Sequence, residues 1–136
     1  MRFLARMPFL KIAAGLLILY AMVWISLEGR LGQVLLLAFG VTIVGTAFAW
    51  QRYLAWSKNA PWRWLAATAL TGLLGGLFMG LLVITLMAIK TGLHGHGPEF
   101  IPDQVSWVIN QIPLWSAVGL LTGLGTGVLI AGLRKD

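Results

Sequence analysis

The sequence predicts an all-α integral membrane protein whose four transmembrane helices form two antiparallel hairpins. Hydrophobic residues make up 59% of the 136 residues and charged residues only 10%, whereas soluble domains carry about 25% charged residues. Four continuous apolar segments each approach or exceed the roughly 20 residues that a helix needs to cross a bilayer. These segments lack the inside–outside alternation of membrane β-strands, so we expect helices throughout a single transmembrane domain, residues 1–136.

The expected spans cover residues 8–27, 31–50, 62–89 and 113–133. The first follows a basic N-terminus, as in a signal peptide. Its apolar run is too long for a signal sequence, however, and no A-x-A-like cleavage site follows, so we expect it to be retained. The connection Glu28–Arg30 is so short that the first two spans must form a hairpin. Pro61 is suited to the first turn of the third helix.

The longest connection, residues 90–112, is expected to contain a short amphipathic helix at the membrane surface. Its second half lies between two prolines and places four apolar residues at helical spacing: Val105, Val108, Ile109 and Ile112. Such a helix would lie in the plane of the interface. An irregular loop is the alternative.

Basic residues predict that both termini are cytoplasmic. Lys and Arg in short flanking loops favour the cytoplasmic side, and eight of the ten lie in the three regions that a four-span chain puts on one side: Arg2, Arg6, Lys11, Arg52, Lys58, Arg63, Arg134 and Lys135. Arg30 and Lys90 lie on the other side, with Glu28, Glu99 and Asp103. The bacterial inner (cytoplasmic) membrane fits this pattern, although an organelle membrane would share it.

The last two spans each carry a G-x-x-x-G-x-x-x-G series. The helix-packing candidates are Gly72, Gly76 and Gly80 in the third span and Gly119, Gly123 and Gly127 in the fourth. Residues four apart share a helix face, and small residues on one face allow close backbone contact between membrane helices. The two faces are therefore expected to pack against each other or against a partner.

Aromatic residues gather at the predicted membrane boundaries. Indole rings favour this zone because they combine an apolar body with a polar N–H group. The expected interface anchors are Trp50, Trp56, Trp62, Trp64, Trp107 and Trp115. Lys11 and Lys90 lie near span ends, where their ammonium groups can reach water.

The loop "TGLHGHGPEF" holds the candidate metal ligands His94, His96 and Glu99. A structural zinc site needs four ligands and a catalytic one usually three, so an H-x-H pair with one carboxylate is a weak signal. A solvated or partner-contacting loop is the competing interpretation. The chain has no cysteine, which excludes thiolate chemistry and disulfides.

Other functional classes find little support in the sequence. The basic residues are scattered rather than clustered as in a nucleic-acid patch, and no span carries an ionisable residue near its centre, where proton pathways are found. No nucleophile–base pair or phosphate-binding loop is present, so we expect neither catalysis nor a cofactor.

The sequence thus favours a non-catalytic subunit that packs through glycine-rich helix faces against larger membrane subunits, in contact with lipids. A small homo-oligomeric channel or transporter with hydroxyl-lined helices is the first alternative. A metal-binding or pH-sensing role of the histidine loop on the outer face is the second.

Overall fold

The computed structural model describes residues 8–27, 29–56, 61–94 and 99–133, and these residues form four α-helices. Helix α1 spans Pro8–Ser26, α2 Leu31–Trp56, α3 Pro61–His94 and α4 Pro102–Leu133. All four are long and apolar enough to cross a membrane, which agrees with the composition. Helices are the expected solution because a helix satisfies its own backbone hydrogen bonds in lipid.

The helix boundaries differ from the expected spans mainly at the membrane surfaces. α1 and the start of α2 agree with the expectation, but α2 continues to Trp56 and α3 to His94. Both extensions carry polar or basic residues that a hydrophobicity criterion excludes from a span. A helix can continue beyond the hydrocarbon zone because its backbone bonding does not depend on apolar side chains.

The expected break before Pro113 is not present. Residues 102–112, predicted as a separate short helix, are the first part of α4, which continues through Pro113 to Leu133. A proline removes one backbone donor, but membrane helices tolerate it because neighbouring groups satisfy the freed carbonyl. The segment also packs into the protein, since the Val108 side chain is fully buried.

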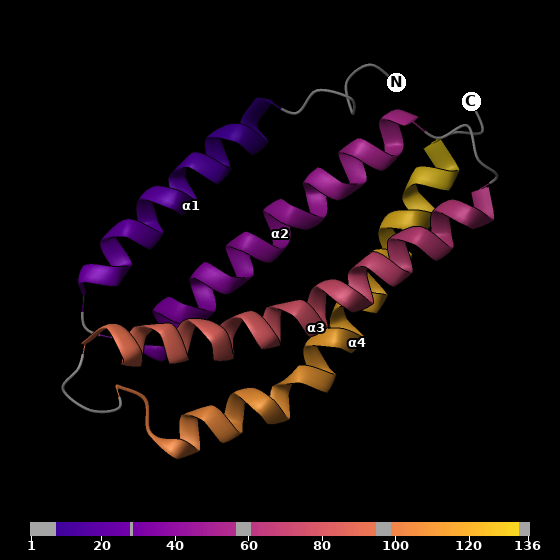
Figure 1. Cartoon of the computed structure of the whole chain (residues 1–136). Coiled ribbons are helices and arrows are strands. Elements are labelled where there is room, and N and C mark those ends of the chain that lie inside the picture. The colour runs from indigo at the N-terminus through magenta and orange to yellow at the C-terminus, as the bar shows by residue number, and fades with distance from the viewer. Residues whose placement is uncertain (1–7, 28, 57–60, 95–98, 134–136) are drawn as a thin grey trace.

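The helices follow one another across the molecule in chain order, with α1 beside α2, α2 beside α3 and α3 beside α4 (Figure 1). α3 and α4 make by far the most extensive contact, and α1 contacts the rest chiefly through α2. Much of α1 therefore remains exposed, including Phe9, Ile12 and Leu16. Apolar exposure of this kind is what a helix facing lipid requires.

The buried core lies at one end of the molecule. It contains Trp24 of α1, Val34, Leu37 and Ala38 of α2, Val83 and Met87 of α3, Phe100, and Val108 of α4. The end of α1, the start of α2, the end of α3 and the start of α4 meet there. Toward the opposite end, where both chain termini lie, α2 and α3 diverge (Figure 1).

Candidate functional site

The six glycines of the two series lie between α3 and α4. A Cβ atom built on Gly72 would overlap the carbonyl oxygen of Gly119, and one on Gly119 would overlap that of Gly72. Gly76 faces the carbonyl group of Trp115, and Gly123 that of Thr68, equally closely. These four positions admit no side chain because the obstructing atoms belong to the backbone.

The ends of this glycine seam meet side chains. A Cβ atom on Gly80 would overlap Ile112, and one on Gly127 would meet the hydroxyl group of Thr68 and the backbone of Leu65. The structure therefore places all six glycines against the neighbouring helix of the same chain. While α3 and α4 stay paired, this surface is closed to another protein.

Threonine hydroxyl groups in the spans donate to their own helices. Thr68 donates to the carbonyl oxygen of Trp64 at 2.9 Å, and Thr71 to that of Ala67 at 2.8 Å. The same bond, at 2.8 Å, joins each of four further threonines to the residue four positions earlier: Thr42, Thr85, Thr122 and Thr126. This bonding leaves each of these donors already occupied.

Lys90 lies inside the protein, fully buried, rather than at the membrane surface as the sequence suggested. Its Nζ atom donates to the carbonyl oxygens of Trp24 at 2.7 Å, Ile25 at 3.0 Å and Leu27. It also lies 4.9 Å from the centre of the Trp24 ring. The last carbonyl groups of a helix lack intrahelical donors and form the negative end of its dipole. The ammonium group thus caps α1 from α3.

Glu99 packs against the connection between α1 and α2. The carboxylate is partly buried, and its Oε2 atom occupies the space that a Cβ atom on Gly29 would need. His94 is the last residue of α3, with its side chain outside the described part of the structure, and His96 lies outside the described residues. Among the residues that are described, no group of three or more His, Asp or Glu side chains could hold a metal ion.

The predicted tryptophan anchors occupy different environments. Trp62 and Trp107 are exposed, and Trp107 meets Trp115 edge to face with ring centres 6.1 Å apart. Trp64 is only 1% exposed, so it does not fit an anchoring role. It lies four residues before Thr68 and eight before Gly72, on the face that packs against α4. The Trp56 side chain lies outside the described part.

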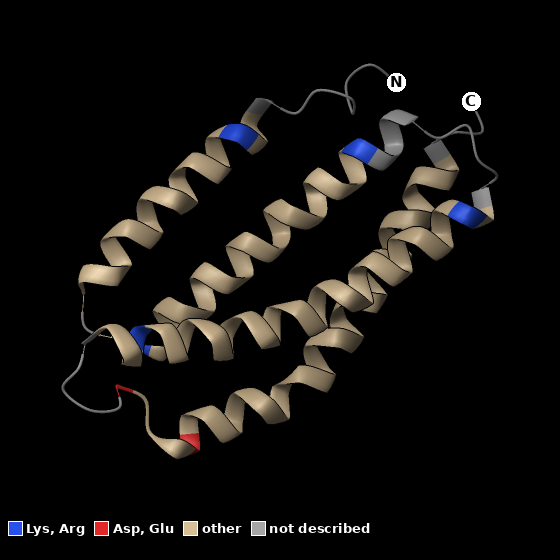
Figure 2. Cartoon of the chain, viewed as in Figure 1, with Lys and Arg blue, Asp and Glu red and all other residues tan. Residues whose placement is uncertain are grey.

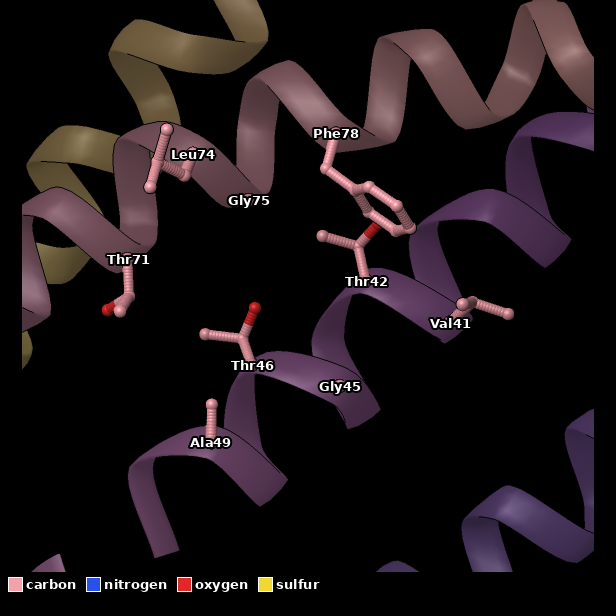
Figure 3. A pocket seen from close by; sticks show the side chains of 9 residues that line it. All are labelled: Val41, Thr42, Gly45, Thr46, Ala49, Thr71, Leu74, Gly75 and Phe78. Carbon is pink, nitrogen blue, oxygen red and sulfur yellow. The ribbon is translucent and has the colours of Figure 1, made fainter. Parts of the chain in front are cut away.

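The remaining anchor, Trp50, joins α2 to α3. Its Nε1–H group donates to Oγ1 of Thr71 at 2.6 Å. The bond lies next to a cavity of about 270 Å³ between the two helices (Figure 3). The cavity is lined by Val41, Thr42, Gly45, Thr46 and Ala49 of α2 and Thr71, Leu74, Gly75 and Phe78 of α3. The sequence pattern does not predict this cavity, because the cavity depends on the separation between two helices.

The acidic residues that the structure describes lie at one end of the molecule, whereas basic residues lie at both ends, with Arg30 and Lys90 at the acidic end (Figure 2). Lys11 lies in the first turn of α1, Arg52 near the end of α2 and Arg63 in the first turn of α3, all at the end that holds the termini. Glu99 and Asp103 lie at the other end.

No protein-family model matches the chain, and neither a curated protein nor a solved structure matches it.

Proposed function

We propose that the chain is a non-catalytic integral membrane subunit that packs laterally against other membrane proteins. The observation that carries the proposal is a second set of glycines, on the side of α4 that faces away from α3. Cβ atoms added at Gly125 and Gly132 would meet nothing within 4 Å. Glycine costs about 1 kcal/mol relative to alanine inside a helix, and no contact among the described residues requires a glycine at either position.

The geometry of α4 supports a docking face at these glycines. At 3.6 residues per turn, Gly125 and Gly132 lie opposite the seam glycines. They share this face with Leu114, Leu121 and Val128, which are 56%, 67% and 60% exposed. Large side chains beside glycine hollows suit the close approach of another membrane helix. Because the seam is closed by α3, we assign partner contact to this outer face of α4 instead.

We propose further that both termini face the cytoplasm of a bacterial inner membrane. The support is the charge distribution of the described residues. Lys11, Arg52 and Arg63 lie at the end that holds the termini, and the other end has both acidic residues together with Arg30 and Lys90. This is the arrangement that the positive-inside rule describes.

The alternative of a hydroxyl-lined homo-oligomeric channel receives less support. The threonine donors described above bond to their own helices, which reduces what they can offer to a hydrated ion. The α3–α4 pair is also too closely packed along its glycines to form part of an opening.

The docking proposal is tested by extracting the tagged full chain in mild detergent and identifying the proteins that accompany it. The double variant Gly125→Leu and Gly132→Leu should lose those proteins while the chain itself stays folded, because both positions have room for a side chain. Gly15→Leu, at an equally open position on α1, is the matched control. Retention of the same partners by the double variant would refute the α4 face. A second copy of the chain as sole companion would refute a hetero-complex.

A further inference from the structure

We propose that the cleft between α2 and α3 binds an anionic phospholipid. One acyl chain would occupy the cavity, and the headgroup phosphate would lie near Arg52 and Arg63. This site is separate from the α4 docking face. It rests on the lining of the cavity, its size and the charges at the nearby end of the helices.

The lining suits hydrocarbon and little else. Val41, Leu74 and Phe78 contribute apolar side chains, while Gly45, Ala49 and Gly75 keep the space open. Two of the three hydroxyl groups on the lining donate to their own helices: Thr42 to the carbonyl oxygen of Ala38, and Thr71 to that of Ala67. The Thr71 oxygen in turn accepts from Trp50. A buried water needs two to four polar partners, so water is a poor occupant.

The apolar character of the cavity favours a lipid chain as its occupant. An empty space of about 270 Å³ would forfeit dispersion contacts along its wall. A lipid chain is slender, apolar and present at high concentration around every transmembrane helix. Hydrocarbon is therefore the occupant that the lining favours.

The headgroup preference follows from the positive charges beyond the cavity. Arg52 lies three residues after the lining residue Ala49, and Arg63 eight residues before the lining residue Thr71. At a rise of 1.5 Å per residue these intervals are about 4.5 and 12 Å along the helices, toward the same end of the molecule. Arg52 is exposed, and the Arg63 guanidinium lies 5.8 Å from the centre of the Trp62 ring.

Two arginines beyond the cavity, toward the same end of the molecule, favour an anionic headgroup over a zwitterionic one, because they repel the cation that a zwitterionic headgroup carries beside its phosphate. Basic pockets between transmembrane helices on the cytoplasmic side bind anionic headgroups in this way. No acidic residue among those described lies at this end; Glu99 and Asp103 are at the other (Figure 2). The charged side chains described at this end would therefore attract an anionic lipid.

Native mass spectrometry of the purified full chain tests the proposal, with phosphatidylglycerol and phosphatidylcholine of the same acyl composition as probes. The wild type should retain one phosphatidylglycerol and prefer it to phosphatidylcholine. Gly45→Leu should abolish retention, because Gly45 lines the cavity and a Cβ atom added there meets nothing within 4 Å, so the new side chain would occupy the cavity. Each of Arg52→Gln and Arg63→Gln should weaken phosphatidylglycerol binding about fivefold and leave phosphatidylcholine unchanged.

Two controls separate this site from general effects of lipid and charge. Gly15→Leu adds the same side chain at an open position on α1, and Lys11→Gln removes a positive charge from the same helix, at the end of the molecule where Arg52 and Arg63 lie. Both should bind phosphatidylglycerol as the wild type does. Equal retention of the two lipids by the wild type, or undiminished retention by Gly45→Leu, would overturn the proposal. So would a lipid-free dimer that Gly45→Leu converts to monomers.

Discussion

Gly72 of α3 and Gly119 of α4 meet backbone to backbone, and each occupies the space that a side chain on the other would need. The relationship is reciprocal, so neither position can change alone without moving the helix axes apart. Similar contacts at Gly76 and Gly123 extend the seam. Because lipid provides no hydrophobic drive for helix association, this close approach is the main source of stability of the α3–α4 pair.

Gly76→Ala should destabilise the protein by about 1–3 kcal/mol, the usual cost of inserting a methyl group into a packed interior. The methyl group would overlap the carbonyl group of Trp115, which is held in a helix and cannot turn away. The free energy of unfolding in mixed micelles measures the effect.

Gly125→Ala is the matched control, since it makes the same change in the adjoining helix where a Cβ atom meets open space. It should be neutral or stabilising by up to about 1 kcal/mol, because alanine is the better helix former. Equal effects of the two substitutions would mean that helix propensity, and not the seam, sets the stability of the pair.

The sequence allowed the helices and the seam glycines to be predicted because both are properties of local pattern. Continuous apolar runs identify spans, and a four-residue repeat identifies a face. The pattern could not tell whether Gly72 meets Gly119 or a different protein. For Trp64, two features of the sequence predict different locations. Its spacing from Thr68 and Gly72 indicates the packed face, whereas its residue type indicates the membrane surface.

Other features depend on tertiary distances that no local pattern encodes. Lys90 caps a helix whose last residues lie more than 60 positions earlier in the chain. A lysine near a span end gives no indication of such a partner. The α2–α3 cavity depends on the separation between two helices as well as on small lining residues such as Gly45 and Gly75. A helix break was expected before Pro113 because proline usually ends helices in water. Within α4, however, the helix continues through it.

Lys90→Met should loosen the attachment of α1. Methionine keeps a similar length but cannot donate to the carbonyl groups of Trp24, Ile25 and Leu27. Leaving the buried Trp24 acceptor unsatisfied costs about 1–3 kcal/mol. Spin labels at the exposed residues Ile18 and Leu81 should report a broader distance distribution in the variant.

Lys11→Met provides the control for Lys90→Met, because Lys11 is exposed in the first turn of α1. It should leave both the label distances and the free energy of unfolding at their wild-type values. If Lys90→Met did the same, the ammonium group would contribute nothing to holding α1.

The bond from Trp50 to Thr71 should provide measurable coupling between α2 and α3. Trp50→Phe and Thr71→Val each remove one partner, and the double-mutant cycle isolates their interaction. Interhelical hydrogen bonds in membrane proteins average about 0.6 kcal/mol in such cycles, and we expect a coupling of about that size. A coupling of zero would show that the 2.6 Å contact contributes no stability.

The histidine loop should not hold zinc stoichiometrically. An H-x-H pair supplies two ligands where zinc sites need at least three from the protein, and the Glu99 Oε2 atom is packed against Gly29. Equilibrium dialysis of the purified chain against zinc, followed by metal analysis, should find the same low content in the wild type and in the His94→Ala, His96→Ala double variant. One zinc ion per wild-type chain that the double variant loses would instead establish a metal site in this loop.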